Sequence, residues 1–247
     1  MQNIGNKRRK PNKKKVKAFC SAMLSVGTPV KSYRFWVIML QLMLIVIMAA
    51  FAILAVLVKT VPSFFIDLQV TRAIQLINFP SFTLLMKVVS WPGFSPQVMI
   101  ITVLIVCLIY AFGFHWETTV ALVSAAFPTA INFAVKILVQ RPRPLPNLVS
   151  VDDTLSGYSF PSGHVMFYLC FFGFLVFLDL HLLKPSLKRS LILIFFVSLI
   201  AMIGISRIYL GQHWASDVLG AYLLGCLILA AIIRIYLWGK KSYFIHK

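Results

Sequence analysis

The chain has 247 residues, of which 60% are hydrophobic and only 12% are charged, whereas a typical soluble domain carries about 25% charged residues. The composition therefore excludes an ordinary soluble protein and indicates an integral membrane protein. The net charge of +18 does not indicate a nucleic-acid partner, because ten of the 24 lysines and arginines precede Phe35; there they favour a cytoplasmic tail that contacts anionic lipid head groups.

Six apolar stretches follow this tail, each close to the roughly 20 residues that a membrane-spanning helix needs. They are Phe35–Val58, Val98–Phe114, Thr118–Val139, Val165–Leu183, Ser190–Ile205 and Val218–Trp238. We therefore expect an all-α fold: a basic cytoplasmic tail over residues 1–34, and a six-span transmembrane helical bundle over residues 35–247. The first stretch is too long for a cleavable signal peptide and lacks a small-residue cleavage site, so we expect it to remain.

The segment over residues 62–92 is too apolar for a solvated loop. Its hydrophobic side chains recur at roughly helical spacing, broken by Asp67 and Arg72. We expect short interfacial helices here, between spans one and two. Ser95 and Pro96 then resemble the start of the second span.

Basic residues predict the orientation, because they are retained on the cytoplasmic side of a membrane. One cluster lies between the fourth and fifth stretches, at Lys184, Lys188 and Arg189. A second lies at the C-terminal end, at Arg234, Lys240, Lys241 and Lys247. Both agree with the basic tail, so we expect a multi-pass protein of the cell membrane with both termini in the cytoplasm.

The first set of unusual polar residues ends the third stretch. A cation within an apolar stretch costs a few kcal/mol, so Lys136 is a functional candidate. The prolines at 142 and 144 force Arg141 and Arg143 out of α geometry, which ends the helix and can turn an arginine back toward a pocket. Alternatively, Lys136 reaches the interface along its aliphatic stem and the arginines contact lipid head groups.

The second set is Ser162, Gly163 and His164, which follow Pro161 at the start of the fourth stretch. Gly163 permits close approach of the backbone, and Ser162 can cap the helix. The N–H groups of a helix start can bind an anion. The alternative is a plain capped helix with an incidental histidine beside it.

The third set, Arg207, His213 and Asp217, occupies the connection between the fifth and sixth stretches. If the sixth helix begins near His213, Asp217 lies one turn on and can hold the His213 Nδ1–H, leaving Nε2 free to attack. Alternatively, Asp217 only caps the helix and Arg207 extends to the interface. All three sets lie at the outer ends of spans, so together they predict an extracytoplasmic anion site with two histidines.

In order and spacing, the three sets resemble the motifs of the type 2 phosphatidic acid phosphatase superfamily, which includes lipid phosphate phosphatases, glucose-6-phosphatase and vanadium haloperoxidases. The resemblance covers roughly residues 60–235. It implies that His213 is the nucleophile, His164 the acid and base, and Asp217 the orienting partner. The residues implied to bind the phosphoryl oxygens are Lys136, Arg143, Ser162, Gly163 and Arg207.

We therefore expect a membrane hydrolase that removes a terminal phosphate from a lipid phosphate or polyprenyl diphosphate through a phosphohistidine. Three cationic side chains can neutralise the charge of the phosphoryl group, and the sequence has no carboxylate cluster that could bind a metal ion. We therefore expect neither a metal nor another cofactor. The expected partners are the bilayer and the lipid substrate, with no nucleic acid.

Two alternatives to this function remain. A vanadate-dependent haloperoxidase would use the same residues, although six spans favour an amphiphilic substrate. A transporter would carry its polar groups near the bilayer midplane rather than at one interface. Among lipid substrates, the compact six-span chain resembles bacterial members that act on undecaprenyl diphosphate, while phosphatidylglycerophosphate and phosphatidate present a similar terminal phosphate.

Overall fold

A computed structural model describes residues 30–61, 64–153 and 155–244. Most of the tail predicted over residues 1–34 lies outside the described residues. Contacts divide the chain into two units, residues 1–45 and residues 46–247. The first unit contributes the beginning of the apolar helix α2 (Val30–Thr60), and the second contains the rest of that helix and all later elements.

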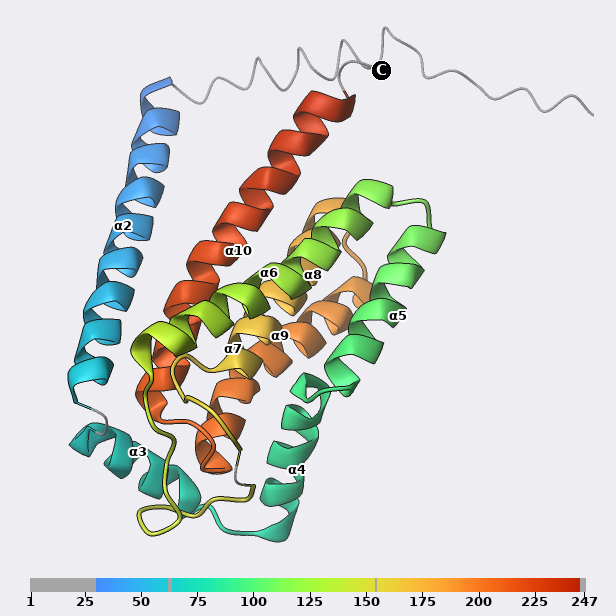
Figure 1. Cartoon of the computed structure of the whole chain (residues 1–247). Helices are drawn as coiled ribbons and strands as arrows, with labels where there is room; N and C mark the ends of the chain where they lie inside the picture. The colour runs from blue at the N-terminus through green and yellow to red at the C-terminus, as the bar shows by residue number, and fades with distance from the viewer. Residues whose placement is uncertain (1–29, 62–63, 154, 245–247) are drawn as a thin grey trace, which may run out of the picture. The chain divides into compact units, whose positions relative to one another are not determined.

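The described part of the chain contains helices and no strands, as the sequence predicts (Figure 1). After α2, the helices in chain order are α3 (Phe65–Gln75), α4 (Pro80–Ser90), α5 (Gln97–Ala111), α6 (His115–Val139), α7 (Gly163–Phe167), α8 (Gly173–Leu182), α9 (Leu187–Tyr209) and α10 (Ala215–Phe244). A 3₁₀ turn, η1 (Trp91–Gly93), extends α4. A π-helical turn, η2 (Tyr168–Phe172), joins α7 to α8 into one continuous helix.

Five helices of the described chain are long and apolar enough to cross a membrane: α2, α6, the α7–α8 helix, α9 and α10. A sixth candidate is the pair formed by α3 with α4, which is bent by 120°. The stretch predicted as the second span becomes α5, which has only 15 residues and therefore extends about 22 Å, less than the ~30 Å hydrocarbon core of a bilayer. The structure confirms the predicted all-α membrane fold, but the described chain has five spans, or six only if the bent α3–α4 pair counts as one, and the predicted second span is not among them.

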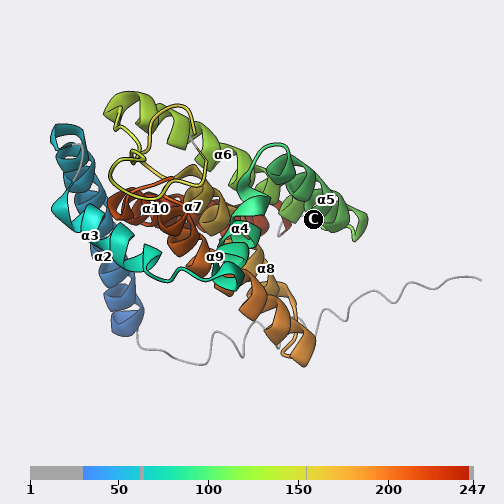
Figure 2. The same cartoon turned by 90° about the horizontal axis from the view of Figure 1, so that it is seen from below.

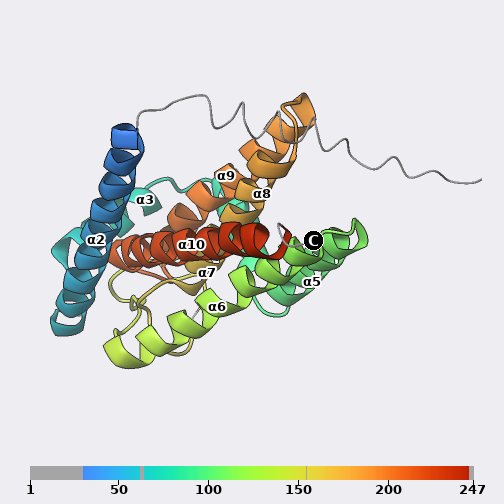
Figure 3. The same ribbon diagram turned by 90° about the horizontal axis from the view of Figure 1, so that it is seen from above.

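The α7–α8 helix is the most buried span of the bundle. It contacts α6, α9 and α10, and seen from below it lies between them (Figure 2). Seen from above, α5 lies beside α6 (Figure 3). The central position of the α7–α8 helix explains why its middle is apolar all round, with Tyr168, Phe171 and Phe174 fully buried.

The segment in which short interfacial helices were predicted does contain two short helices, α3 and α4, and α4 begins at Pro80. One face of α4 is buried against α9. Two hydroxyls hold α4 in the bundle: Ser206 of α9 donates to the Met86 carbonyl at 2.6 Å, and Tyr168 of η2 donates to the Val89 carbonyl at 2.7 Å. The α4 helix is therefore part of the bundle wall.

The long connection between α6 and α7 is held against the turn that precedes α10. Its Asp152 N–H donates to the Leu210 carbonyl at 3.1 Å. The next residue of that turn, Gly211, has a φ of 66°, and a Cβ there would lie 2.0 Å from the Ser150 carbonyl oxygen. Only glycine satisfies both the backbone conformation and this close approach.

Candidate active site

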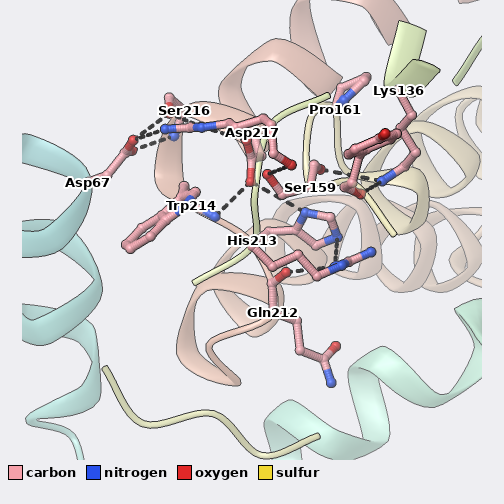
Figure 4. A network of polar contacts seen from close by, with 12 residues as sticks. Asp67, Lys136, Ser159, Pro161, Gln212, His213, Trp214, Ser216 and Asp217 are labelled. Atoms are coloured by element: carbon pink, nitrogen blue, oxygen red, sulfur yellow. Dashed lines mark hydrogen bonds and ion pairs between the residues drawn. The ribbon is translucent and has the colours of Figure 1, made fainter. Parts of the chain in front are cut away.

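The residues of all three predicted sets meet at one end of the bundle. They come from the end of α6, the connection after it, the start of α7, the end of α9 and the start of α10. Figure 4 shows the part of this region around His213. The site is therefore assembled from segments that lie far apart in the sequence.

His213 lies in the turn before α10, and Asp217 lies in the first turn of that helix. The helix begins at Ala215, slightly later than predicted. The distance from His213 Nδ1 to Asp217 Oδ2 is 3.5 Å, longer than a hydrogen bond, and such catalytic contacts often shorten in the substrate complex. The same oxygen accepts the Trp214 N–H at 2.9 Å. Asp217 therefore caps the helix and also faces the histidine.

The other ring nitrogen of His213 faces a guanidinium. Arg143 Nη1 lies 3.4 Å from His213 Nε2, and it also donates to the Gln212 carbonyl at 2.8 Å. Burial, followed by the charges of Lys136, Arg143 and Arg207, lowers the pKa of His213 well below its ordinary 6.5. The ring is therefore neutral at neutral pH.

Lys136 does not extend along α6 to the interface. Its ammonium donates to the Tyr158 carbonyl and lies 3.5 Å from the Ser159 carbonyl. Ser159 is in turn fixed by its N–H, which donates to the Arg141 carbonyl at 2.9 Å. These bonds turn the lysine toward the connection that leads into the second set.

Ser162 occupies the N-cap position of α7, but its side chain makes no capping hydrogen bond, so the predicted cap is wrong. The Asn132 amide instead holds the chain by donating to the Pro161 carbonyl at 3.0 Å. At Gly163, a Cβ would lie 3.2 Å from Asn132 Oδ1, which agrees with the predicted close approach. Ser162 Oγ and His164 Nε2 are buried and have no hydrogen-bond partner among the described residues.

Arg207 is fully buried, which excludes the interpretation that it extends to the interface. Its Nη1 donates to Ser90 Oγ of α4 at 2.5 Å, and its guanidinium lies 5.2 Å from the Phe94 ring centroid. Phe94 also packs edge-on against His164, with 4.7 Å between ring centroids. Within the described chain, Nε and Nη2 of Arg207 have no hydrogen-bond partner.

Three residues of a buried polar network join this site in the structure, although the sequence assigned none of them a role in it. Arg141 is buried and pairs with both Asp217 and Asp67, and Ser216 bonds to both Arg141 and Asp67. The scarcity of acidic residues could have drawn attention to this network, since the chain has only six. Each carboxylate within an apolar segment needs a partner.

The two other histidines of the described chain, His115 and His181, do not approach the site. His115 begins α6, whose other end carries Lys136. His181 stacks on Phe177 with 5.4 Å between ring centroids. In the described ranges, no three side chains of His, Cys, Asp or Glu are grouped to hold a metal ion. The positive charges of the site belong to lysine and arginine.

Comparison with known proteins agrees with this geometry. Residues 117–241 match the PAP2 superfamily. Phosphatidylglycerophosphatase B of Bacillus subtilis (strain 168) is 30% identical over 180 residues, which cover 72% of this chain and 87% of that protein.

Two solved structures are similar. The crystal structure of a transmembrane PAP2 type phosphatidylglycerolphosphate phosphatase from Bacillus subtilis has a TM-score of 0.68 and 27% identity, covering 78% of this chain and 94% of that chain. Aquifex aeolicus LpxE has a TM-score of 0.55 and 19% identity, covering 70% of this chain and 98% of that chain. The second similarity concerns the fold alone.

Proposed function

Because the chain belongs to the PAP2 superfamily and is a membrane phosphatase, we propose that it hydrolyses the terminal phosphate of a lipid phosphate through a phosphohistidine on His213. The observation that carries this proposal is the environment of His213. A buried neutral imidazole lies between the Asp217 carboxylate and three cationic side chains. A nucleophile for an anionic phosphoryl group needs both features.

In the first step, His213 Nε2 attacks phosphorus in line with the leaving oxygen. The nitrogen–phosphorus bond forms while the bond from phosphorus to the lipid oxygen breaks, and His164 gives the leaving oxygen a proton. Asp217 stabilises the tautomer that carries its proton on Nδ1. The proton transfer from His164 is worth typically about 10²–10⁴-fold in rate.

In the second step, water attacks phosphorus and gives its proton to His164. The nitrogen–phosphorus bond breaks, which releases inorganic phosphate and restores neutral His213. The products are phosphate and the lipid alcohol, or the lipid monophosphate when the substrate is a diphosphate. The same histidine therefore acts as acid and then as base.

The phosphoryl oxygens need positive charge and hydrogen-bond donors on three sides. The groups that can supply them are the side chains of Lys136, Arg143, Ser162 and Arg207 and the backbone N–H of Gly163. The buried atoms of Ser162 and Arg207 that have no partner in the described chain support this assignment. Since the charge comes from the protein itself, we propose a reaction that needs no metal ion.

For the substrate we propose a lipid that presents its terminal phosphate at the extracytoplasmic surface of the cell membrane. The relative from Bacillus subtilis is named for phosphatidylglycerophosphate. The compact multi-span chain also suits a polyprenyl diphosphate. Both lipids present a terminal phosphoryl group to the site. The protein can therefore distinguish them only by contacts with the rest of the lipid.

A panel of lipid phosphates tests the proposal with purified protein in detergent. We expect phosphate release from phosphatidylglycerophosphate, undecaprenyl diphosphate or phosphatidate, and none from the His213→Ala protein. Release from no lipid would contradict the proposal. Halide oxidation by the vanadate-treated protein would instead favour the haloperoxidase alternative.

A further inference from the structure

A buried network extends from Asp217, which faces the candidate nucleophile, through Arg141 to Asp67 of α3 (Figure 4). Arg141 Nη1 donates to Asp217 Oδ1 at 2.6 Å, and Arg141 Nη2 donates to Asp67 Oδ2 at 2.7 Å. Ser216 strengthens the link, because its backbone N–H and its hydroxyl donate to the two Asp67 oxygens at 2.8 and 2.6 Å. All three charged side chains are at most 3% exposed.

The two oxygens of Asp217 have separate partners. Oδ1 accepts from Arg141, while Oδ2 accepts the Trp214 N–H and faces His213. The Arg141 contact therefore fixes the rotation of the carboxylate and determines which oxygen meets the histidine. The planar guanidinium is rigid enough to do this, because its two terminal nitrogens donate to different carboxylates.

Charge explains why Asp67 is needed. A guanidinium buried with one carboxylate would be free to draw that carboxylate away from the histidine. Asp67 and Ser216 hold the far side of the guanidinium, so Arg141 is fixed from two directions. Removing one member of a buried ion network leaves an uncompensated charge that forces the others to rearrange.

We propose that Asp67 and Arg141 are positioning residues of the phosphatase reaction, acting on His213 through Asp217. The proposal rests on the proposed function of His213. Asp67 lies in α3, outside the family match over residues 117–241. Helix α3 thus helps to position the nucleophile, although none of its atoms need touch the substrate.

The test uses Asp67→Asn, with Ser216→Ala as a milder change to the same link. The substrate is p-nitrophenyl phosphate, so the lipid specificity does not enter. The matched control is Glu117→Gln, which alters another buried carboxylate of the bundle. Glu117 accepts from Lys240 at 2.5 Å and from Tyr236 at 3.0 Å, at the opposite end of α6 from Lys136.

We expect Asp67→Asn to lower kcat by ~10–100-fold, by analogy with the loss typical when a hydrogen-bond partner of a metal-bound histidine is removed. KM should stay within about threefold, because an effect on the nucleophile alone leaves ground-state binding unchanged. Ser216→Ala should lower kcat in the same way but less, and Glu117→Gln should keep the parent kcat.

A double variant separates positioning from general stability. In the Asp217→Asn background, Asp67→Asn should have little further effect on kcat, since residues that act through one network are not additive. Folded Asp67→Asn protein with the parent kcat, or full multiplication of the two losses, would overturn the proposal. If Asp67→Asn does not fold, the same two criteria apply to Ser216→Ala. An inactive parent protein would instead contradict the proposed function.

Discussion

Gly93 tests the placement of His164 with a single methyl group. A Cβ at position 93 would lie 2.2 Å from His164 Cδ2. To reach the 3.4 Å of an ordinary contact, the ring must move by 1.2 Å. Phe94 packs against the same ring, so Gly93→Ala should displace the imidazole that we propose as acid and base.

The expected magnitude follows from that displacement. A misplacement of about 1 Å in a catalytic group can lower the rate by about 10²-fold. The loss should be largest for a lipid phosphate, because a basic alkoxide needs a proton to leave. It should be much smaller for the first step with p-nitrophenyl phosphate, whose leaving group is weakly basic.

The assay is a burst experiment with both substrates. Gly225→Ala is the control, because it adds the same methyl group in α10, where the nearest atom is Leu169 Cδ2 at 2.7 Å, the end of a flexible side chain. Full activity of folded Gly93→Ala with the lipid would refute the reasoning. An equal loss on both substrates would show that the methyl group damages more than proton transfer.

Three further predictions concern the chemistry, the orientation and the nucleophile. Phosphatase activity should survive EDTA and be inhibited by orthovanadate, which can adopt a five-coordinate geometry like the transition state; activity lost in EDTA and restored by a divalent ion would contradict this. On intact cells, an impermeant thiol reagent should label Asp153→Cys and not Ser186→Cys in a cysteine-free background, and the reverse pattern would overturn the predicted topology. Because its pKa is lowered, His213 should show the ¹⁵N shifts of neutral imidazole down to pH 6.5 and protonate only below it, so a midpoint at or above 6.5 would contradict the described burial.

The candidate site could be predicted from the sequence where its partners are close along the chain. Arg143 follows Lys136 by seven residues, and Asp217 follows His213 by four. At such short spacing, helix geometry and proline constraints already limit where the side chains can point. The three sets could then be combined because all end at the same side of the predicted spans.

The Asp67–Arg141 pair could not be predicted in this way, because 74 residues separate its members. Local spacing carries no information on such a contact. In the sequence, Asp67 is recognisable only as a charged residue that interrupts an apolar segment. Ser90 of α4 was missed for the same reason, since its contact with Arg207 spans 117 residues. Tertiary packing determines both contacts.

The ends of the predicted second span show a different limit of prediction from hydropathy. Hydropathy over residues 98–114 is continuous, yet α5 ends at Ala111, and Gly113 adopts a φ of 83° soon afterwards. A sum of apolar residues does not reveal such a backbone break. At the other end, Pro96 is the N-cap and the helix begins at Gln97, one residue after the predicted proline start.

The most direct test of the account is to trap the phosphoryl group on the enzyme. The His164→Ala protein should form the intermediate from p-nitrophenyl phosphate and hydrolyse it slowly, because the second step has lost its base. After rapid quenching of a reaction with ³²P-labelled substrate, we expect acid-labile label on the peptide that contains His213, and none in the His213→Ala protein. Label on His164 of the parent protein, or a burst of nitrophenol without any labelled histidine, would contradict the central claim.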